Sequence, residues 1–213
     1  MLGFIAVFAI VCVAHIVFIS LGKRTARRVS KVLLIPALLA AYIASGTQLF
    51  FPIPALVLGW IGDVILIRKD KKIFFLLGLI AFLLGHIFYI ISFIECLERL
   101  SIGTLIFSLP LAIVFGTIAF RIIKPPKGTI LPVIIYMIVL ETVALLGLQV
   151  FASGFNFAGA LIFFGCLLFM VSDLILSYYA FRMVKRLGAV FVMVFYILAQ
   201  AGIILGLIYL PQP

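Results

Sequence analysis

Long apolar segments, separated by short loops, make up most of this 213-residue chain and limit its fold more than any other feature. Eight of them approach the length with which a helix crosses a bilayer, roughly 20 residues within a range of about 17 to 25. They cover about 2–21, 32–48, 52–67, 73–94, 102–120, 130–150, 156–181 and 189–209. Because these runs lack the alternation of barrel strands, we predict an all-α membrane protein with eight transmembrane helices.

The composition excludes an ordinary soluble domain. Hydrophobic residues make up 67% of the chain and charged residues only 10%, whereas soluble domains are about half apolar. The first segment has no basic residue before its apolar run and no small-x-small cleavage site, so we expect a retained helix and not a signal peptide. The chain is therefore predicted to be a single multi-pass transmembrane domain over residues 1–213, in the cell (inner) membrane.

The placement of the basic residues predicts the orientation. All Lys and Arg except Arg99 lie in four alternate stretches, 23–31, 68–72, 121–127 and 182–186. The positive-inside rule makes these loops cytoplasmic, which places both termini on the other side of the membrane. The net charge of +10 is thus explained by orientation and by contact with membrane lipids, and we expect no nucleic-acid partner.

Two aspartates interrupt the apolar runs in nearly the same local sequence, Ile61-Gly62-Asp63-Val64 and Val171-Ser172-Asp173-Leu174. A carboxylate at the bilayer centre costs on the order of 2.5–3.5 kcal/mol, so a retained one usually faces a polar interior. Each aspartate is followed by a basic loop and then by a helix containing Phe-Tyr-Ile. We therefore predict two fused four-helix repeats in parallel orientation, with halves 1–101 and 102–213.

Further polar side chains lie deep in the same segments and complete the candidate site. By helical rise, Asp63 is about 7 Å inward of Arg68 and Asp173 about 13 Å inward of Arg182. Asp63, Asp173 and His86 are the predicted catalytic residues. The predicted substrate-binding or supporting residues are Tyr89, Glu141, Ser177, Tyr196 and Gln200. Pairing of Asp63 with a loop base such as Arg68 is the structural alternative, and His15 is expected to be structural.

No metal or other cofactor is expected. The chain has only two histidines, His15 and His86, without the spacing of a zinc site, and it contains neither a Walker loop nor a Gly-x-Ser-x-Gly elbow. Its three cysteines form no disulfide framework. These absences disfavour a zinc hydrolase, a nucleotide-driven transporter and a conventional serine hydrolase.

Four ordered motifs resemble those of the YhhN family, which includes the lysoplasmalogenases. They are Gly59-Trp60-Ile61-Gly62-Asp63, Gly85-His86 with Tyr89, Gly165 to Asp173, and Phe195-Tyr196-Ile197-Leu198-Ala199-Gln200. Two positions depart from the family pattern: Gly85 stands in place of Ala, and Phe195 replaces the first Tyr, with an extra residue before Ala199. Neither departure removes an acid or the histidine.

The resemblance implies hydrolysis of the vinyl-ether bond of a lysophospholipid, giving a fatty aldehyde and glycerophospho-ethanolamine or -choline. Two carboxyl groups fit such chemistry, one as acid and one to stabilise the oxocarbenium ion and activate water. We expect Asp63 and Asp173 to form this pair, with His86 and Tyr196 orienting water or the leaving oxygen. Arg68 or Arg182 is expected to hold the phosphate.

Two other functions fit the same residues. Intramembrane Asp, Glu and His also form proton relays, so a proton-coupled transporter or lipid carrier is the principal alternative. A hydrolase of another lysolipid is the second. The sequence does not determine the head group or the oligomeric state.

Overall fold

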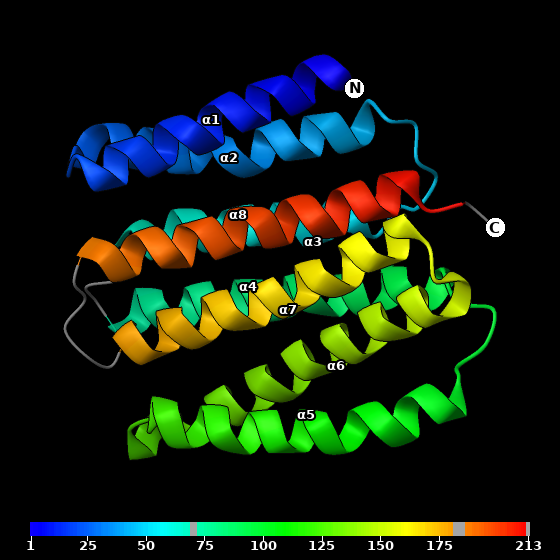
Figure 1. Ribbon diagram of the computed structural model, residues 1–213. Coiled ribbons are helices and arrows are strands. Elements are labelled where there is room, and N and C mark those ends of the chain that lie inside the picture. Colours follow the sequence, from blue (N-terminus) through cyan, green and yellow to red (C-terminus); the bar gives the residue numbers. More distant parts are fainter. Residues whose placement is uncertain (69–71, 181–185, 212–213) are drawn as a thin grey trace. The chain divides into compact units, whose positions relative to one another are not determined.

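The computed structural model describes residues 1–68, 72–180 and 186–211, and its described part contains helices and no strands (Figure 1). Within these ranges, eight α-helices follow one another. They are α1 (Leu2–Ser20), α2 (Arg24–Ile43), α3 (Pro52–Ile65), α4 (Lys72–Glu95), α5 (Ile102–Ile123), α6 (Ile130–Gly154), α7 (Phe157–Ala180) and α8 (Arg186–Tyr209). Short 3-10 turns, η1 (Leu66–Arg68) and η2 (Lys127–Thr129), follow α3 and precede α6. The predicted all-α class is confirmed.

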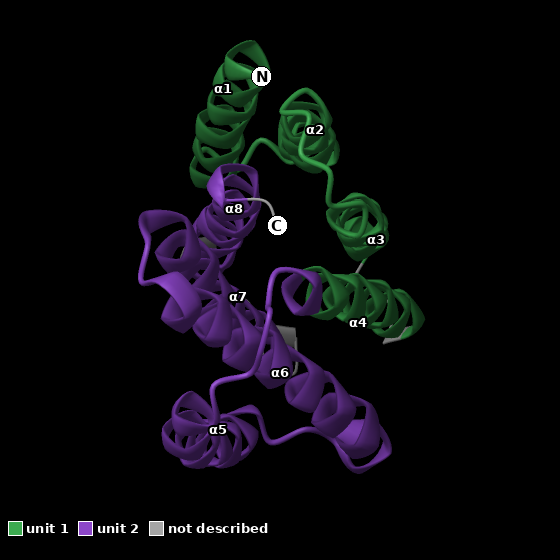
Figure 2. Ribbon diagram, turned by 90° about the vertical axis from the view of Figure 1, so that its right-hand side faces the viewer, with its two compact units in different colours: residues 1–92, 212 green, residues 93–211, 213 purple. Residues whose placement is uncertain are grey.

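The chain divides into two compact units, residues 1–92 and residues 93–211, whose boundary falls inside α4 (Figure 2). In the first unit α1 packs on α2 and α2 on α3; in the second, α6 packs on α5 and α7, and α7 packs on α8. The duplication with halves 1–101 and 102–213 stays a prediction.

Six of the eight helices within the described ranges are long and apolar enough to cross a membrane. The expectation of eight spans is therefore supported for six. The other two are α2 and α3. The first turns of α2 carry basic residues, and α3 has only 14 residues, so at about 1.5 Å per residue it is shorter than a bilayer core.

The second helix begins earlier than predicted, at Arg24 and not near residue 32. The stretch with Arg24, Arg27, Arg28 and Lys31 is helical because long basic side chains can lay their methylenes along apolar surface while the charge reaches water. The helix continues through Pro36 and ends at Ile43. Within this stretch, which was predicted to be a loop, Arg24 and Arg28 are exposed, whereas Ser30 is buried and the Lys31 side chain is only 14% exposed.

Glycines bring two helix pairs into close contact. An ideal Cβ on Gly165 of α7 would lie 2.8 Å from the backbone N of Ile203 and 2.9 Å from the carbonyl O of Ala199, both in α8. In the first unit, a Cβ on Gly85 of α4 would lie 3.1 Å from the carbonyl O of Ala55 in α3. Such backbone contact is typical of tightly packed membrane helices.

Candidate functional site

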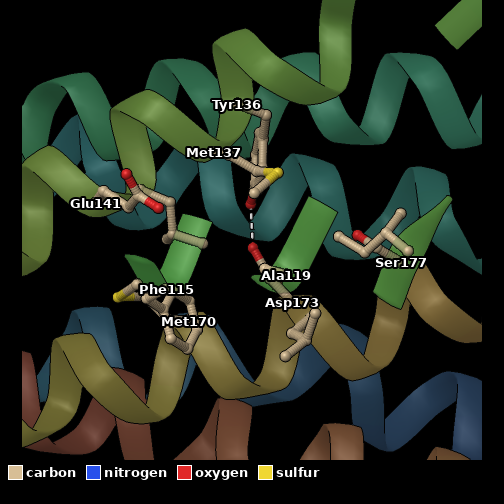
Figure 3. A pocket seen from close by; sticks show the side chains of 11 residues that line it. Phe115, Ala119, Tyr136, Met137, Glu141, Met170, Asp173 and Ser177 are labelled. Atoms are coloured by element: carbon tan, nitrogen blue, oxygen red, sulfur yellow. Dashed lines mark hydrogen bonds between the residues drawn. The ribbon is translucent and has the colours of Figure 1, made fainter. Parts of the chain in front are cut away.

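Asp173 lies in a small cavity between α5, α6 and α7 of the second unit. The phenol of Tyr136, on α6, donates a hydrogen bond to Oδ2 of Asp173, on α7 (Figure 3). Asp173 is 8% exposed and Tyr136 is 6% exposed. The cavity has a volume of about 30 Å³, which exceeds the roughly 10–15 Å³ that a water molecule needs. A carboxylate, a phenol and room for water therefore meet inside an apolar helix bundle.

Ser177 and Glu141 line the same cavity. Ser177 follows Asp173 at i+4, and this places both on one face of α7, as the sequence indicated. Glu141 comes from α6, one turn and a half beyond Tyr136, and appears beside it in Figure 3. Two of the predicted supporting residues thus lie with one predicted catalytic residue.

The carboxyl group of Glu141 has an unusual environment. Its Oε1 atom is buried and has no hydrogen-bond partner among the described residues. The same atom lies against Gly116 of α5, in the space that a Cβ would fill. A buried polar atom without a partner is costly. This oxygen is therefore positioned for a ligand, a proton or water.

Tyr196 and Gln200 lie on α8, four residues apart, and both are buried. The ring of Tyr196 packs edge-on against Phe169 of α7, with 5.5 Å between ring centroids. The neighbouring Ser172 donates from its hydroxyl to the carbonyl of Val192, 3.0 Å away, and so ties α7 to α8. The two residues of the Ser-Asp motif therefore hydrogen-bond to different helices: Ser172 to α8 and Asp173 to α6.

Asp63, on α3 of the first unit, has a different kind of partner. Its Oδ1 atom lies 3.1 Å from Nζ of Lys31, on α2, and the two side chains are 3% and 14% exposed. The structural alternative was an ion pair between Asp63 and a loop base such as Arg68. The base found at Asp63 is Lys31, which was predicted to lie in a loop and which lies within α2. In each unit the aspartate is thus contacted from the preceding helix, by an ammonium in one and a phenol in the other.

His86 and Tyr89 are buried on α4, each 2% exposed, with 6.5 Å between ring centroids. Nδ1 of His86 is 2.7 Å from the carbonyl O of Phe82. Since a carbonyl only accepts, Nδ1 carries the hydrogen and Nε2 is the acceptor nitrogen of the neutral ring. The ring of Phe82 lies against Gly62, the residue before Asp63, because an ideal Cβ there would be 2.8 Å from it.

His15 makes a structural contact between α1 and α2. Its Nδ1 atom lies 2.8 Å from the Ser30 hydroxyl, which itself lies 2.8 Å from the carbonyl O of Ala26. His15 is fully buried. This agrees with the structural role expected from the sequence.

The sequence did not indicate two of the side chains that contact the aspartates. Lys31 was read as a loop base. Tyr136 lies in a segment that is apolar on every face, so no polar stripe marks it. The only sign of Tyr136 in the sequence was its position, because it shares the buried face of α6 with Leu140, Val143 and Gly147, at the spacing of a helix.

Arg182, which was expected as a possible phosphate contact, lies outside the described residues. In the described ranges, no three His, Cys, Asp or Glu side chains lie together as metal ligands do.

The model of the YhhN family matches residues 26–207, which is most of the chain. The chain belongs to the YhhN family. Neither curated proteins nor solved structures gave a match. YhhN membership is consistent with a membrane hydrolase, and the apolar helices indicate an integral membrane protein. The match includes both aspartates, His86 and Tyr136.

Proposed function

We propose that this YhhN protein hydrolyses the vinyl-ether bond of lysoplasmalogens, releasing a fatty aldehyde and glycerophospho-ethanolamine or -choline. The observation that supports this most is the Asp173 cavity, where a buried carboxylate, a phenol donor and a second carboxyl group surround space for water. Family membership supports the class of reaction.

The reaction needs an acid and then a nucleophilic water. A proton is added to the vinyl carbon farther from oxygen, and the adjacent carbon becomes part of an oxocarbenium ion. Water attacks that carbon and loses a proton, and the resulting hemiacetal collapses to the aldehyde and the free hydroxyl of the glycerol. One carboxyl group gives a proton to carbon, and one carboxylate stabilises the cation and takes a proton from water, as in glycoside hydrolysis. Return of that proton from the second group to the first, through water, restores both groups.

The two carboxyl groups of the cavity divide these roles. Asp173 accepts the Tyr136 hydrogen bond, a charge-assisted contact that suits a carboxylate, so we assign it the base and cation-stabilising role. Glu141 has no ion pair among the described residues and an unpartnered Oε1, and we assign it the acid role. Ser177 is proposed to position the water. The pairing of Asp63 with Asp173 that the sequence suggested, with His86 and Tyr196 in support, stays an untested prediction, and Glu141 takes the place of Asp63 as the acid in this proposal.

Purified protein in nanodiscs, given lysoplasmalogen and assayed for aldehyde, tests the proposal. Asp173→Asn and Glu141→Gln are each expected to lower the rate about 10²–10⁴-fold, as for loss of an acid–base group. The matched controls are Glu95→Gln and Tyr209→Phe, at exposed positions, and both should keep the wild-type rate. A folded Asp173→Asn protein with wild-type aldehyde release would exclude the assigned chemistry.

Two parallel substrates separate the remaining alternatives. An ester lysolipid and a saturated ether lysolipid lack the vinyl ether, and neither should be cleaved. Hydrolysis of the ester alone would favour a different lysolipid hydrolase. Proton-driven uptake of lysolipid into vesicles, without cleavage of any of the three, would favour the transporter.

A further inference from the structure

A groove lies between α5 and α6 of the second unit, next to the Asp173 cavity. Its volume is about 310 Å³, within the range of small-molecule pockets, about 300–1,000 Å³. Nine residues line it, namely Ile113, Gly116, Thr117, Phe120, Arg121, Ile134, Met137, Ile138 and Glu141. Ile113 and Ile138 are 61% and 58% exposed. The groove is therefore open on the apolar outer face of these helices, where lipid chains lie.

The groove has one cationic end. Ile113, Thr117 and Arg121 follow one another at i, i+4 and i+8 on α5, so they form a stripe along the groove. Arg121 lies in the last turn of α5, at the end that the positive-inside rule places in the cytoplasm. Thr117 donates its hydroxyl to the carbonyl of Ile113, 2.8 Å away, so its hydrogen is already used within α5. The lining is apolar except for Arg121 and Glu141.

Glu141 and Met137 line both the groove and the Asp173 cavity, so these two residues separate the two spaces. The Glu141 carboxyl lies against Gly116, which is five positions before Arg121 on α5. At about 1.5 Å per residue, this places the carboxyl about 7.5 Å along the helix axis from the backbone of Arg121. In an sn-1 vinyl-ether lysophospholipid, the bonds between phosphorus and the ether oxygen span roughly 6 Å at about 1.2 Å per bond, as in an extended chain.

We propose that the α5–α6 groove binds a single-chain phospholipid from the surrounding membrane, with its hydrocarbon chain along the apolar walls and its phosphate on Arg121. This inference rests on the proposed function for the identity of the lipid. Arginine binds phosphate through paired hydrogen bonds, and the spacing then brings the ether oxygen beside Glu141. The substrate reaches the acid sideways from the bilayer, without passing through water.

Binding is measured separately from cleavage. The probe is a saturated ether lysophosphatidylethanolamine, which has the phosphate and the chain but no vinyl ether, and its dissociation constant is measured on wild-type protein in nanodiscs. Ile138→Trp fills the groove, whereas Ile135→Trp places the same ring at an exposed position of α6 outside it. Ile138→Trp should weaken binding about tenfold or more and Ile135→Trp less than about twofold.

A second pair of variants tests the phosphate contact. Arg121→Gln should weaken binding of the phospholipid about tenfold, as for loss of a charged hydrogen bond, and leave binding of a monoacylglycerol unchanged. Lys124→Gln, just beyond the end of α5, is the control. The groove proposal is overturned if wild type, Ile138→Trp and Arg121→Gln bind the ether lysolipid equally well. It is also overturned if both tryptophan variants lose affinity for that lipid to the same extent. If aldehyde is never released but these variants weaken binding as stated, the proposed function fails and the groove stands.

Discussion

The ion pair between Lys31 and Asp63 gives the sharpest test of how the first unit is held together. At 3.1 Å between Nζ and Oδ1, the attraction is about 5 kcal/mol at an effective dielectric constant of about 20. Desolvation of the two groups offsets most of it, so replacing both partners is close to neutral, whereas removing one costs about 3–5 kcal/mol. The pair therefore predicts a strong asymmetry between single and double variants.

The exposed fractions refine the expected values. Asp63→Asn leaves a lysine that is 14% exposed and can be reached by water, so we expect a loss of about 3 kcal/mol in the free energy of unfolding. Lys31→Met leaves a carboxylate that is 3% exposed, so we expect a larger loss of about 4 kcal/mol in the free energy of unfolding. Because replacing both partners is close to neutral, the double variant should lie within about 1 kcal/mol of wild type, a recovery of about 6–7 kcal/mol relative to the sum of the two single losses. Arg28→Met, at an exposed position of the same helix, should stay within about 0.5 kcal/mol of wild type.

Unfolding is followed by SDS titration in detergent micelles, and aldehyde release is measured on the same preparations. If the single losses add to within about 0.5 kcal/mol of the double variant, the reasoning about this pair is refuted. Activity separates the two roles of Asp63. A stable double variant without activity places Asp63 in the chemistry, whereas a stable and active one leaves it only the ion pair.

Two further predictions concern packing and thiol chemistry. Gly165→Ala should lower the free energy of unfolding by about 1–3 kcal/mol, because its Cβ would meet backbone atoms of α8 at 2.8 and 2.9 Å. The control Gly3→Ala, with open space around it, should not lower it. Equal stability of the two variants would contradict the close contact between α7 and α8. Burial, with the Glu95 carboxylate as a second cause, raises the pKa of the Cys96 thiol to about 11. The thiolate of the folded protein is therefore scarce at pH 7, and the rate of maleimide labelling of Cys96 should rise about tenfold per pH unit until the pH is near that pKa. Labelling that levels off near pH 8.5 would contradict the second prediction.

The sequence predicted the helices well where apolar length alone decides them. The bounds of α1, α4, α7 and α8 lie within a few residues of those expected. The prediction failed at α2, where a basic stretch was assigned to a loop. Such a stretch can be helical because its long side chains cover apolar surface with their methylenes while the charges reach water. The error at α2 also hid Lys31 as the partner of Asp63.

The candidate site was predictable to the extent that polar atoms are rare in apolar segments. Asp173, Glu141 and Ser177 were found in this way and line one cavity. Tyr136 was not, because its place on the buried face of α6 does not by itself indicate a polar contact, and its hydrogen bond to Asp173 depends on tertiary packing. The relation between Asp63 and Asp173 depends on tertiary packing, which no spacing in the sequence determines.

The close backbone contact between α7 and α8 also has a mechanical consequence. Ideal Cβ atoms on Gly165 and Gly206 would meet backbone atoms of the neighbouring helix at 2.7 to 2.9 Å. The two backbones are therefore in direct contact there, and we expect the pair to resist sliding and to keep Asp173 on a stiff support. By contrast, α5 has only Ser108, Ala119 and Ile123 buried, and a helix with few buried contacts shifts at the lowest cost. Slow opening motions in this unit are therefore expected at α5, so turnover should depend on the fluidity of the surrounding bilayer.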